Sequence, residues 1–262
     1  MKCQVTTAKP RMFVTKKESL ERRIWHQQTK GKILSADLKR SETEAIISTA
    51  DHFSQLIDKI LAVPSVWGAR VYFAAYPNAG QLNVPAALEN TLTLIYAPVK
   101  DYDGIIYDVT DKYYVMHPLN APLELPKTAV GSWVRIEYAK KKKLLDPIFN
   151  LYKGDTNCIL FTKTHLEEFK DEILGQDAKY VKAYFSSYLQ NQNPIPGYAC
   201  RMHVDYELLD ANLNEFYIDD CPNFPQRAEP KPLSVDEDNK GFDNGSLCPP
   251  EDYCVGGGLL QP

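Results

Sequence analysis

Two pairs of side chains that could bind a ligand or move a proton stand at matching places along the chain. His52 and His165 each begin a similar ten-residue segment, and Tyr76 and Tyr188 each end an aromatic run. Imidazole changes its charge near neutral pH, and a tyrosine hydroxyl both donates and accepts hydrogen bonds. These four residues, together with Arg70 at the start of the first aromatic run, are the binding candidates. No residue is assigned a catalytic role.

Each of these candidates also has an ordinary structural interpretation. Both histidines stand near a predicted helix start, where a ring nitrogen can hydrogen-bond free backbone groups, and we expect this role for them. Tyrosines at the end of a strand usually pack their rings and leave the hydroxyl near the surface. Their recurrence at matching positions is what makes the pairs candidates for binding.

A metal site would have to use the three cysteines that lie late in the chain, Cys221, Cys248 and Cys254. Cys248 and Cys254 are six residues apart with two prolines between them, whereas structural zinc sites usually show CxxC-type pairs. Redox pairs share the CxxC spacing, which is missing here. The sequence therefore predicts free thiols, no metal and no cofactor, and these three cysteines are the candidates for a metal site should one form.

A run of four lysines, Lys140–Lys143, is a further candidate for binding. Such a run can contact an anionic partner, but Asp146 follows closely, and a solvated helix face is the commoner explanation. No GxGxxG, P-loop, GxSxG or kinase motif is present. The motifs therefore point to no enzyme class.

Hydrophobic spacing predicts the helices of the first half. Thr15–Glu18 is a capping-box pattern that opens a helix ending near Gly31. Ser41–Glu44 is a second such pattern, and apolar residues from Ile46 to Leu61 follow it at spacings of three and four. Pro64 lies just beyond, as is common after a helix end.

Aromatic and β-branched runs predict strands at 70–76 and at 92–97, the second ended by Pro98, with weaker candidates at 105–109 and 113–116. Residues 118–126 hold three prolines in nine positions and are typical of an extended linker. Beyond it the same patterns predict a helix at 128–152 that is broken before Pro147, a helix at 164–174, and strands at 180–188 and 199–206.

The second half resembles the first closely enough to be aligned. His52–Leu61 matches His165–Leu174 at four of ten positions, and Arg70–Tyr76 matches Lys182–Tyr188 at three of seven. We interpret this as a duplicated unit of about a hundred residues, which is longer than a solenoid repeat. The predicted fold is α+β, with two related helix–helix–antiparallel-strand units that arose by internal duplication.

The predicted domains follow from this repeat. The first unit spans 10–117, the Pro-rich linker 118–126, and the second unit 127–220. Residues 225–262 form an acidic tail that is rich in proline and glycine and poor in large apolar side chains. We expect this tail to be disordered or loosely packed.

The repeated strands also carry a family resemblance. Gly68–Tyr76 (GARVYFAAY), followed by Leu92–Pro98 (LTLIYAP), resembles a family of Bacteroidetes bacterial proteins in which a "gIRiYFA.Y" strand precedes a "lTlvlvP" strand. Proteins of that family often end in a Cys-Pro-Pro segment, as Cys248–Pro250 does here. The resemblance covers about a third of the chain and implies a bacterial lineage, but it implies no activity.

Composition and charge limit the partners. The 262 residues carry a net charge of −4, and the last 37 hold seven acids against three bases, so the rest of the chain is balanced. A balanced body has no general attraction to nucleic acid or anionic lipid. The beginning of the chain lacks the apolar core of a signal peptide, and no run of ~18 apolar residues is present, so we expect a cytoplasmic protein.

Two functions remain open at this level. We expect a non-catalytic binding or scaffold protein with an unknown protein partner, no nucleic acid and no membrane. The alternative is an enzyme of unrecognised class, with a cleft between the two units that is lined by tyrosine, histidine and aspartate. The oligomeric state stays open.

Overall fold

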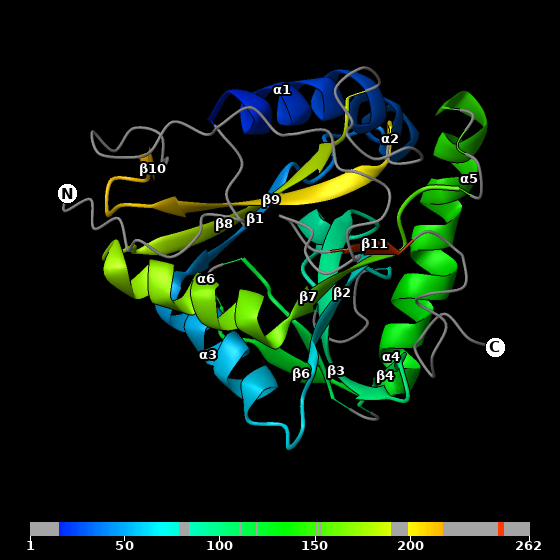
Figure 1. Ribbon diagram of the computed structural model, residues 1–262. Coiled ribbons are helices and arrows are strands. Elements are labelled where there is room, and N and C mark those ends of the chain that lie inside the picture. The colour runs from blue at the N-terminus through cyan, green and yellow to red at the C-terminus, as the bar shows by residue number, and fades with distance from the viewer. Residues whose placement is uncertain are drawn as a thin grey trace, which may run out of the picture.

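The computed structural model describes residues 16–78, 84–109, 112–118, 120–149, 151, 154–189, 199–216 and 246–248. Residues 246–248 are described through their backbone alone. Helices and antiparallel strands make up these ranges, so the α+β prediction is confirmed. Figure 1 shows α1 along one side of the molecule, α3 and α6 together on another, and α5 at a third.

The described strands form two antiparallel sheets. Sheet A has the order β1 (Ala45–Thr49), β8 (Tyr180–Ser187), β9 (Met202–Leu209) and β10 (Glu215–Phe216). Sheet B has the order β11 (Ser246–Cys248), β7 (Cys158–Thr162), β2 (Gly68–Ala75), β3 (Leu92–Tyr102), β5 (Tyr113–Val115) and β6 (Leu123–Leu125), and β4 (Ile105–Asp108) also pairs with β3.

Two interrupted helices and two single helices accompany the sheets. The first interrupted helix consists of α1 (Lys16–His26), the π-helical turn η1 (Gln27–Gly31) and α2 (Lys32–Leu38). The second consists of α4 (Lys127–Ser132), the π-helical η3 (Trp133–Tyr138) and α5 (Ala139–Phe149). The single helices are α3 (Ala50–Leu61) and α6 (Lys163–Gly175), and η2 (Ala86–Leu88) is a short 3₁₀ turn.

The main core lies where α3 and α6 meet the inner faces of both sheets. Phe53 of α3 is at its centre, and its ring meets those of Tyr96, Phe169 and Tyr206 edge-on at centroid distances of 5.3–6.1 Å. These rings come from α6 and from one strand of each sheet. Edge-to-face contacts are the favoured arrangement of aromatic pairs, so this cluster joins the two sheets into one core.

The order of elements occurs twice. An interrupted helix, a strand, a helix and two strands run from α1 to β3, and the same series runs from α4 to β9, apart from the extra turn η2. The first strand of each series pairs with the other series, since β1 pairs with β8 and β7 with β2. This is the order that a duplication would produce, and a common origin of the two halves stays a prediction.

Two buried ion pairs occupy corresponding places in this repeated arrangement. The Asp155 carboxylate pairs with Lys30 and accepts the backbone N–H groups of Thr156 and Met202 at 2.8 and 2.7 Å. In the same way, Glu42 pairs with Lys141. Its carboxylate accepts the backbone N–H of Thr43 at 2.9 Å and that of Leu92, the first residue of β3, at 2.7 Å. Each pair therefore ties an interrupted helix to a loop and to the start of a strand.

The helix predicted from Ile46 begins four residues later, which corrects the assignment. Ala45–Thr49 is strand β1, and Thr49 is the N-cap of α3. Ile46, Ile47 and Thr49 are β-branched and pair with β8, so sheet formation overrides the helical spacing. The sequence prediction also missed β7, which stands in the corresponding place before α6.

Two prolines do not end elements as predicted. Pro147 lies inside the last turns of α5, where buried Leu145 and the contact of Phe149 with Trp25 hold the helix in place. Strand β3 runs through Pro98 to Tyr102. Pro98 uses only its carbonyl there, which accepts the N–H of Val109, so its missing N–H breaks no hydrogen bond.

The sheets also cross the predicted domain boundaries. Residues 118–126, predicted as a linker, contain β6, which pairs with β5. Because β1 and β7 are exchanged between the two series, units 10–117 and 127–220 both contribute strands to each sheet. Of the predicted tail 225–262, only β11 falls within the described residues, where it pairs with β7.

Candidate functional site

Helix α1 lies across a polar face of sheet A (Figure 1). Side chains alternate between the two faces of a strand, and the inward ones of β8 and β9, such as Phe185 and Val204, belong to the core. The alternate residues therefore face α1. They are Lys182, Tyr184 and Ser186 on β8, which pair in register with Glu207, Asp205 and His203 on β9.

The face of α1 that meets this sheet is polar as well. Ser19, Arg23 and His26 are buried at spacings of three and four, which places them on one side of the helix. Ser19 donates a hydrogen bond to Glu207 at 2.7 Å, and Arg23 makes two to Glu215 at 2.9 and 3.1 Å. The helix is therefore held to the sheet through polar contacts.

Five residues in this interface form what we call the Asp205 cluster: Arg22, Ser186, Tyr188, His203 and Asp205. Asp205 is 3% exposed, and Ser186 and His203 are fully buried. Asp205 Oδ1 lies 3.6 Å from His203 Nε2 and 3.9 Å from Arg22 Nη1, beyond hydrogen-bond length in both cases. Tyr188 contacts the His203 ring at a centroid distance of 5.0 Å, and the Arg22 guanidinium lies over its ring at 4.8 Å.

Several polar atoms of this cluster have no hydrogen-bond partner among the described residues. By strict hydrogen-bond geometry they are both carboxylate oxygens of Asp205, both ring nitrogens of His203, the Ser186 hydroxyl and Arg22 Nη1, although the Ser186 hydroxyl lies near enough to Asp205 to lower the pKa of that carboxyl. More than nine in ten buried polar groups in proteins have such a partner, and a group without one costs about 1–3 kcal/mol. A concentration of such groups at one place makes the cluster the candidate binding site within the described part of the chain.

Burial shifts the acid–base groups of the cluster toward their neutral forms. It raises the pKa of Asp205, which the Arg22 charge opposes, and it lowers the pKa of His203 well below its ordinary value. In the same layer, burial raises the pKa of Glu207 to about 8. The shifts favour the neutral forms of these side chains, which can both donate and accept hydrogen bonds.

The other half of the molecule provides an internal comparison. The backbone N–H of Tyr76 donates to the carbonyl of Thr91, and the N–H of Tyr188 donates in the same way to the carbonyl of Arg201. These equivalent bonds align the strand pair β2–β3 with the pair β8–β9. With this alignment, Ala74, Thr93 and Ile95 of sheet B occupy the positions that Ser186, His203 and Asp205 occupy in sheet A. Ala74 and Ile95 belong to a second apolar core with Trp133, which comes from the helix covering sheet B. The architecture therefore does not require a buried aspartate or histidine at these places.

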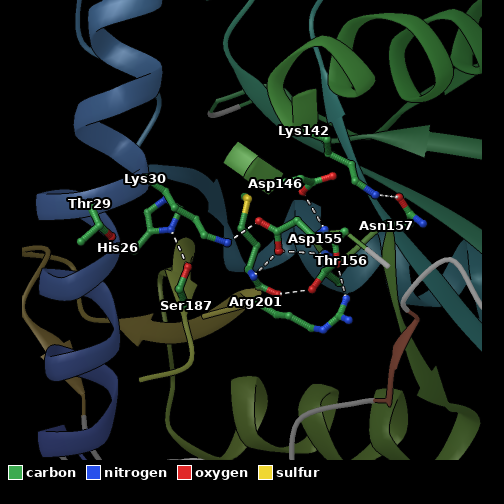
Figure 2. A network of polar contacts seen from close by, with 12 residues as sticks. His26, Thr29, Lys30, Lys142, Asp146, Asp155, Thr156, Asn157, Ser187 and Arg201 are labelled. Atoms are coloured by element: carbon green, nitrogen blue, oxygen red, sulfur yellow. Dashed lines mark hydrogen bonds and ion pairs between the residues drawn. The ribbon is translucent and has the colours of Figure 1, made fainter. Parts of the chain in front are cut away.

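A second polar network adjoins the cluster and is fully paired (Figure 2). It contains the Lys30–Asp155 ion pair, a 2.9 Å hydrogen bond between His26 Nδ1 and the Ser187 hydroxyl, and one of 2.6 Å from Lys142 to Asn157. Burial lowers the pKa of His26 to about 3. Since the same kind of ion pair recurs in the other half, we assign this network a structural role.

The structure separates the predicted tyrosine pair. Tyr188 belongs to the Asp205 cluster, whereas Tyr76 lies on sheet B, where its ring stacks on His117 at 5.6 Å and its hydroxyl is 3.3 Å from His117 Nδ1. Arg70 also lies on sheet B, fully buried, and donates to Asp108 at 2.5 Å and to the carbonyl of Ile106 at 2.9 Å.

The two predicted histidines hold helix starts. The Thr49 hydroxyl accepts the backbone N–H of His52, and the Thr162 hydroxyl accepts that of His165, at 3.2 Å in both cases. His165 Nδ1 also accepts the N–H of Thr162 at 3.3 Å, which completes a capping box. The His165 ring therefore makes the expected contact with the backbone at a helix start, whereas His52 contributes only its backbone N–H, and its ring Nδ1 has no hydrogen-bond partner among the described residues.

The predicted cysteine candidates lie mostly outside the described residues. Cys221 and Cys254 lie outside the described residues, and Cys248 is described only as part of the backbone of β11. Within the ranges that the structure describes, no group of three or more His, Cys, Asp or Glu side chains is placed to hold a metal ion.

Sequence reasoning missed most of the Asp205 cluster, although one signal was present. Met202–Leu209 (MHVDYELL) alternates apolar and polar residues, which is typical of a strand with one polar face. This pattern alone places His203, Asp205 and Glu207 together. The helix that buries them lies about 180 residues earlier in the chain, and no local pattern connects the two.

Comparisons with family models, with curated proteins and with solved structures find no match to this chain. The resemblance to the Bacteroidetes family is therefore untested and stays a prediction. In the described part of the chain, no helix is both long and apolar enough to cross a membrane.

Proposed function

We propose that this protein is a non-catalytic binding protein that holds a small polar molecule in the Asp205 cluster, between α1 and strands β8 and β9. The observation that supports this is the set of unpartnered polar atoms on Arg22, Ser186, His203 and Asp205. The places on sheet B that correspond to Ser186 and Asp205 are the apolar Ala74 and Ile95, so the repeated architecture does not require these polar groups. Residues that weaken folding without structural benefit are typical of functional sites.

The chemistry of the cluster suggests the class of ligand. Asp205 offers acceptors, Arg22 offers a donor, and Ser186 and His203 can do both. Asp205 Oδ1 is 3.6 Å from His203 Nε2 and 3.9 Å from Arg22 Nη1. Each separation is less than the summed length of two hydrogen bonds, so a single ligand atom can contact Oδ1 and one of these nitrogens at the same time. We infer a compact molecule with N–H donors next to a carbonyl or carboxylate oxygen, as in small amides and amino acids.

A second candidate function, an enzyme, is favoured by where the cluster lies. Arg22 comes from the first predicted unit and the other four residues from the second, so tyrosine, histidine and aspartate meet at a contact between the units. Nucleophilic catalysis would need Ser186 hydrogen-bonded to His203. Neither side chain has a hydrogen-bond partner among the described residues, so the geometry favours binding over catalysis.

Thermal unfolding of the full-length protein tests the binding proposal. The protein is first unfolded in denaturant and refolded to remove any bound molecule, and is then melted with each amino acid and with acetamide. At a hundred times its Kd, a ligand adds ~2.7 kcal/mol, or roughly 5–10 °C in Tm for a chain of this size. The shift should disappear in Asp205→Asn and persist in Asp58→Asn, a control at an acid whose side chain is 57% exposed.

The same experiment also reveals a ligand that the probes do not include. Freshly purified protein should then melt above refolded protein in the wild type and not in Asp205→Asn. If no probe raises Tm, and fresh and refolded wild-type protein melt together, the cluster holds only water and the proposal fails.

A further inference from the structure

The outer side of the second interrupted helix displays an unusual mixture of exposed side chains. Three of them are large and apolar: Ile136 at 52%, Leu144 at 36% and Ile148 at 60% exposure. Between them lie Lys140 and Lys143, which are also exposed. We call these five residues the α5 stripe. Figure 1 shows α5 at the flank of the molecule, beside the sheets.

The lysine run divides between two sides of this helix. Lys141 is buried and pairs with Glu42 at 2.5 Å, and Lys142 donates to Asn157 at 2.6 Å. Only the first and last lysines of the run, Lys140 and Lys143, are left on the outer side. Half of the run therefore serves the fold, and the other half contributes charge to a surface.

The stripe lies on a helix that is firmly held from behind. Trp133, Val134, Tyr138 and Leu145 of the same helix are buried in the two cores. The position of the outer side chains is therefore fixed, and their exposure does not come from a loosely attached helix. A rigid helix face costs little conformational entropy when a partner binds it.

The charge of the stripe is opposite to that of the chain as a whole. Of the acids on this helix, Glu137 is 14% exposed and pairs with Lys140 at 2.7 Å, and the half-buried Asp146 accepts the backbone N–H of Asp155 at 2.9 Å. The stripe is therefore apolar and basic on a protein of net charge −4. Apolar side chains next to lysines complement a surface on which apolar side chains lie next to carboxylates.

We propose that the α5 stripe is a docking surface for an acidic amphipathic helix of a partner protein. From Ile136 to Ile148 the stripe extends ~18 Å at 1.5 Å per residue, which matches about three turns of a partner helix. The apolar side chains supply contact area, and the lysines select acidic partners. This inference goes beyond the proposed small-molecule function and does not depend on it.

Fluorescence anisotropy with the full-length protein tests the surface. The probe is a labelled helical peptide of leucine, alanine and glutamate with one apolar face, and the comparison peptide carries lysine in place of glutamate. The acidic peptide should bind and the basic one should not. Lys140→Glu combined with Lys143→Glu, and separately Ile148→Gln, should each weaken binding at least about fivefold.

Matched controls on α6 separate the stripe from general surface effects. Leu174→Gln removes an apolar side chain that is 66% exposed, and Lys163→Glu reverses a lysine that is 53% exposed. Both should leave peptide affinity unchanged, as should Asp205→Asn, which affects the small-molecule site alone. Hydrogen exchange of α5 should slow when the acidic peptide is added, which checks the location in the unmodified protein.

Three results would overturn the proposal. In the first, the acidic and basic peptides bind equally well. In the second, Leu174→Gln weakens binding as much as Ile148→Gln does. In the third, phosphatidylglycerol vesicles bind through the stripe while the acidic peptide does not, which would assign this face to an anionic membrane surface instead.

Discussion

Replacing the charged pair of the Asp205 cluster by apolar residues should stabilise the protein. The variant is the double substitution Arg22→Met and Asp205→Leu, which removes both Asp205 carboxylate oxygens and Arg22 Nη1, atoms without a hydrogen-bond partner among the described residues. Tyr188, Ser186 and His203 remain in place. The variant therefore measures what the charged pair contributes to folding when no ligand is present.

The expected gain follows from the geometry of the pair. At 3.9 Å, the attraction between Arg22 and Asp205 is about 4 kcal/mol for an effective dielectric constant of 20. Burying each ion costs several kcal/mol, and the described residues give Asp205 no hydrogen bond of good geometry in return. Exchanging such a pair for apolar residues typically gains about 1–4 kcal/mol, so we expect a gain of ~1–3 kcal/mol. In a chain of this size, each kcal/mol raises Tm by roughly 2–4 °C.

Urea unfolding of refolded, ligand-free protein is the assay, with a matched double variant as the control. Glu42→Leu combined with Lys141→Met removes the other kind of buried pair, in which the carboxylate also accepts two backbone N–H groups at 2.9 and 2.7 Å. Those N–H groups then lose their acceptor, so this variant should lose about 2–5 kcal/mol. A comparable loss of unfolding free energy in the Arg22/Asp205 variant, at unchanged m-value, would refute the reasoning.

Three further predictions concern groups outside the pair. Lys30→Met should lower the unfolding free energy in urea by about 3–5 kcal/mol, because it leaves the Asp155 charge buried without a counter-ion, and a loss under ~1 kcal/mol would contradict this. The folded-state pKa of Glu207, about 8 against an ordinary 4.5, means that the folded protein binds the proton more tightly, so stability falls as pH rises through this range. Glu207→Gln should flatten that fall by more than about 1 kcal/mol between pH 5 and 8, and parallel pH curves would disprove the assignment. Thr162→Ala and Thr49→Ala should each cost ~1 kcal/mol in thermal unfolding through lost helix caps, whereas no change in either would show that the caps are unimportant.

The sequence predicts the elements that have a long and regular pattern. Helices α3 and α6 and strands β2 and β8 follow from the spacing of their apolar and aromatic residues, although α3 begins later than predicted. Strands β1 and β7 could not be found in this way, since each is five residues long and passes directly into a helix at a threonine. Their pairing with the opposite half is a long-range choice that no local pattern records.

The candidate site was predictable only in part. Tyr188 was selected because it repeats Tyr76, yet the two lie on different sheets and have different neighbours. Asp205 and His203 could be placed on one face of a strand by their alternation. Their burial depends on Arg22 and the rest of α1, and only the folded structure shows that their polar atoms lack hydrogen-bond partners among the described residues.

Native mass spectrometry of the freshly purified full-length protein tests the central claim most directly. The account predicts that the wild type carries one discrete excess mass of an amide- or amino-acid-like molecule, which Asp205→Asn loses and Asp58→Asn keeps. An excess mass that matches a metal ion would contradict the proposed ligand class. A bare mass in all three proteins, with no probe raising Tm, would contradict the claim that the Asp205 cluster is a binding site.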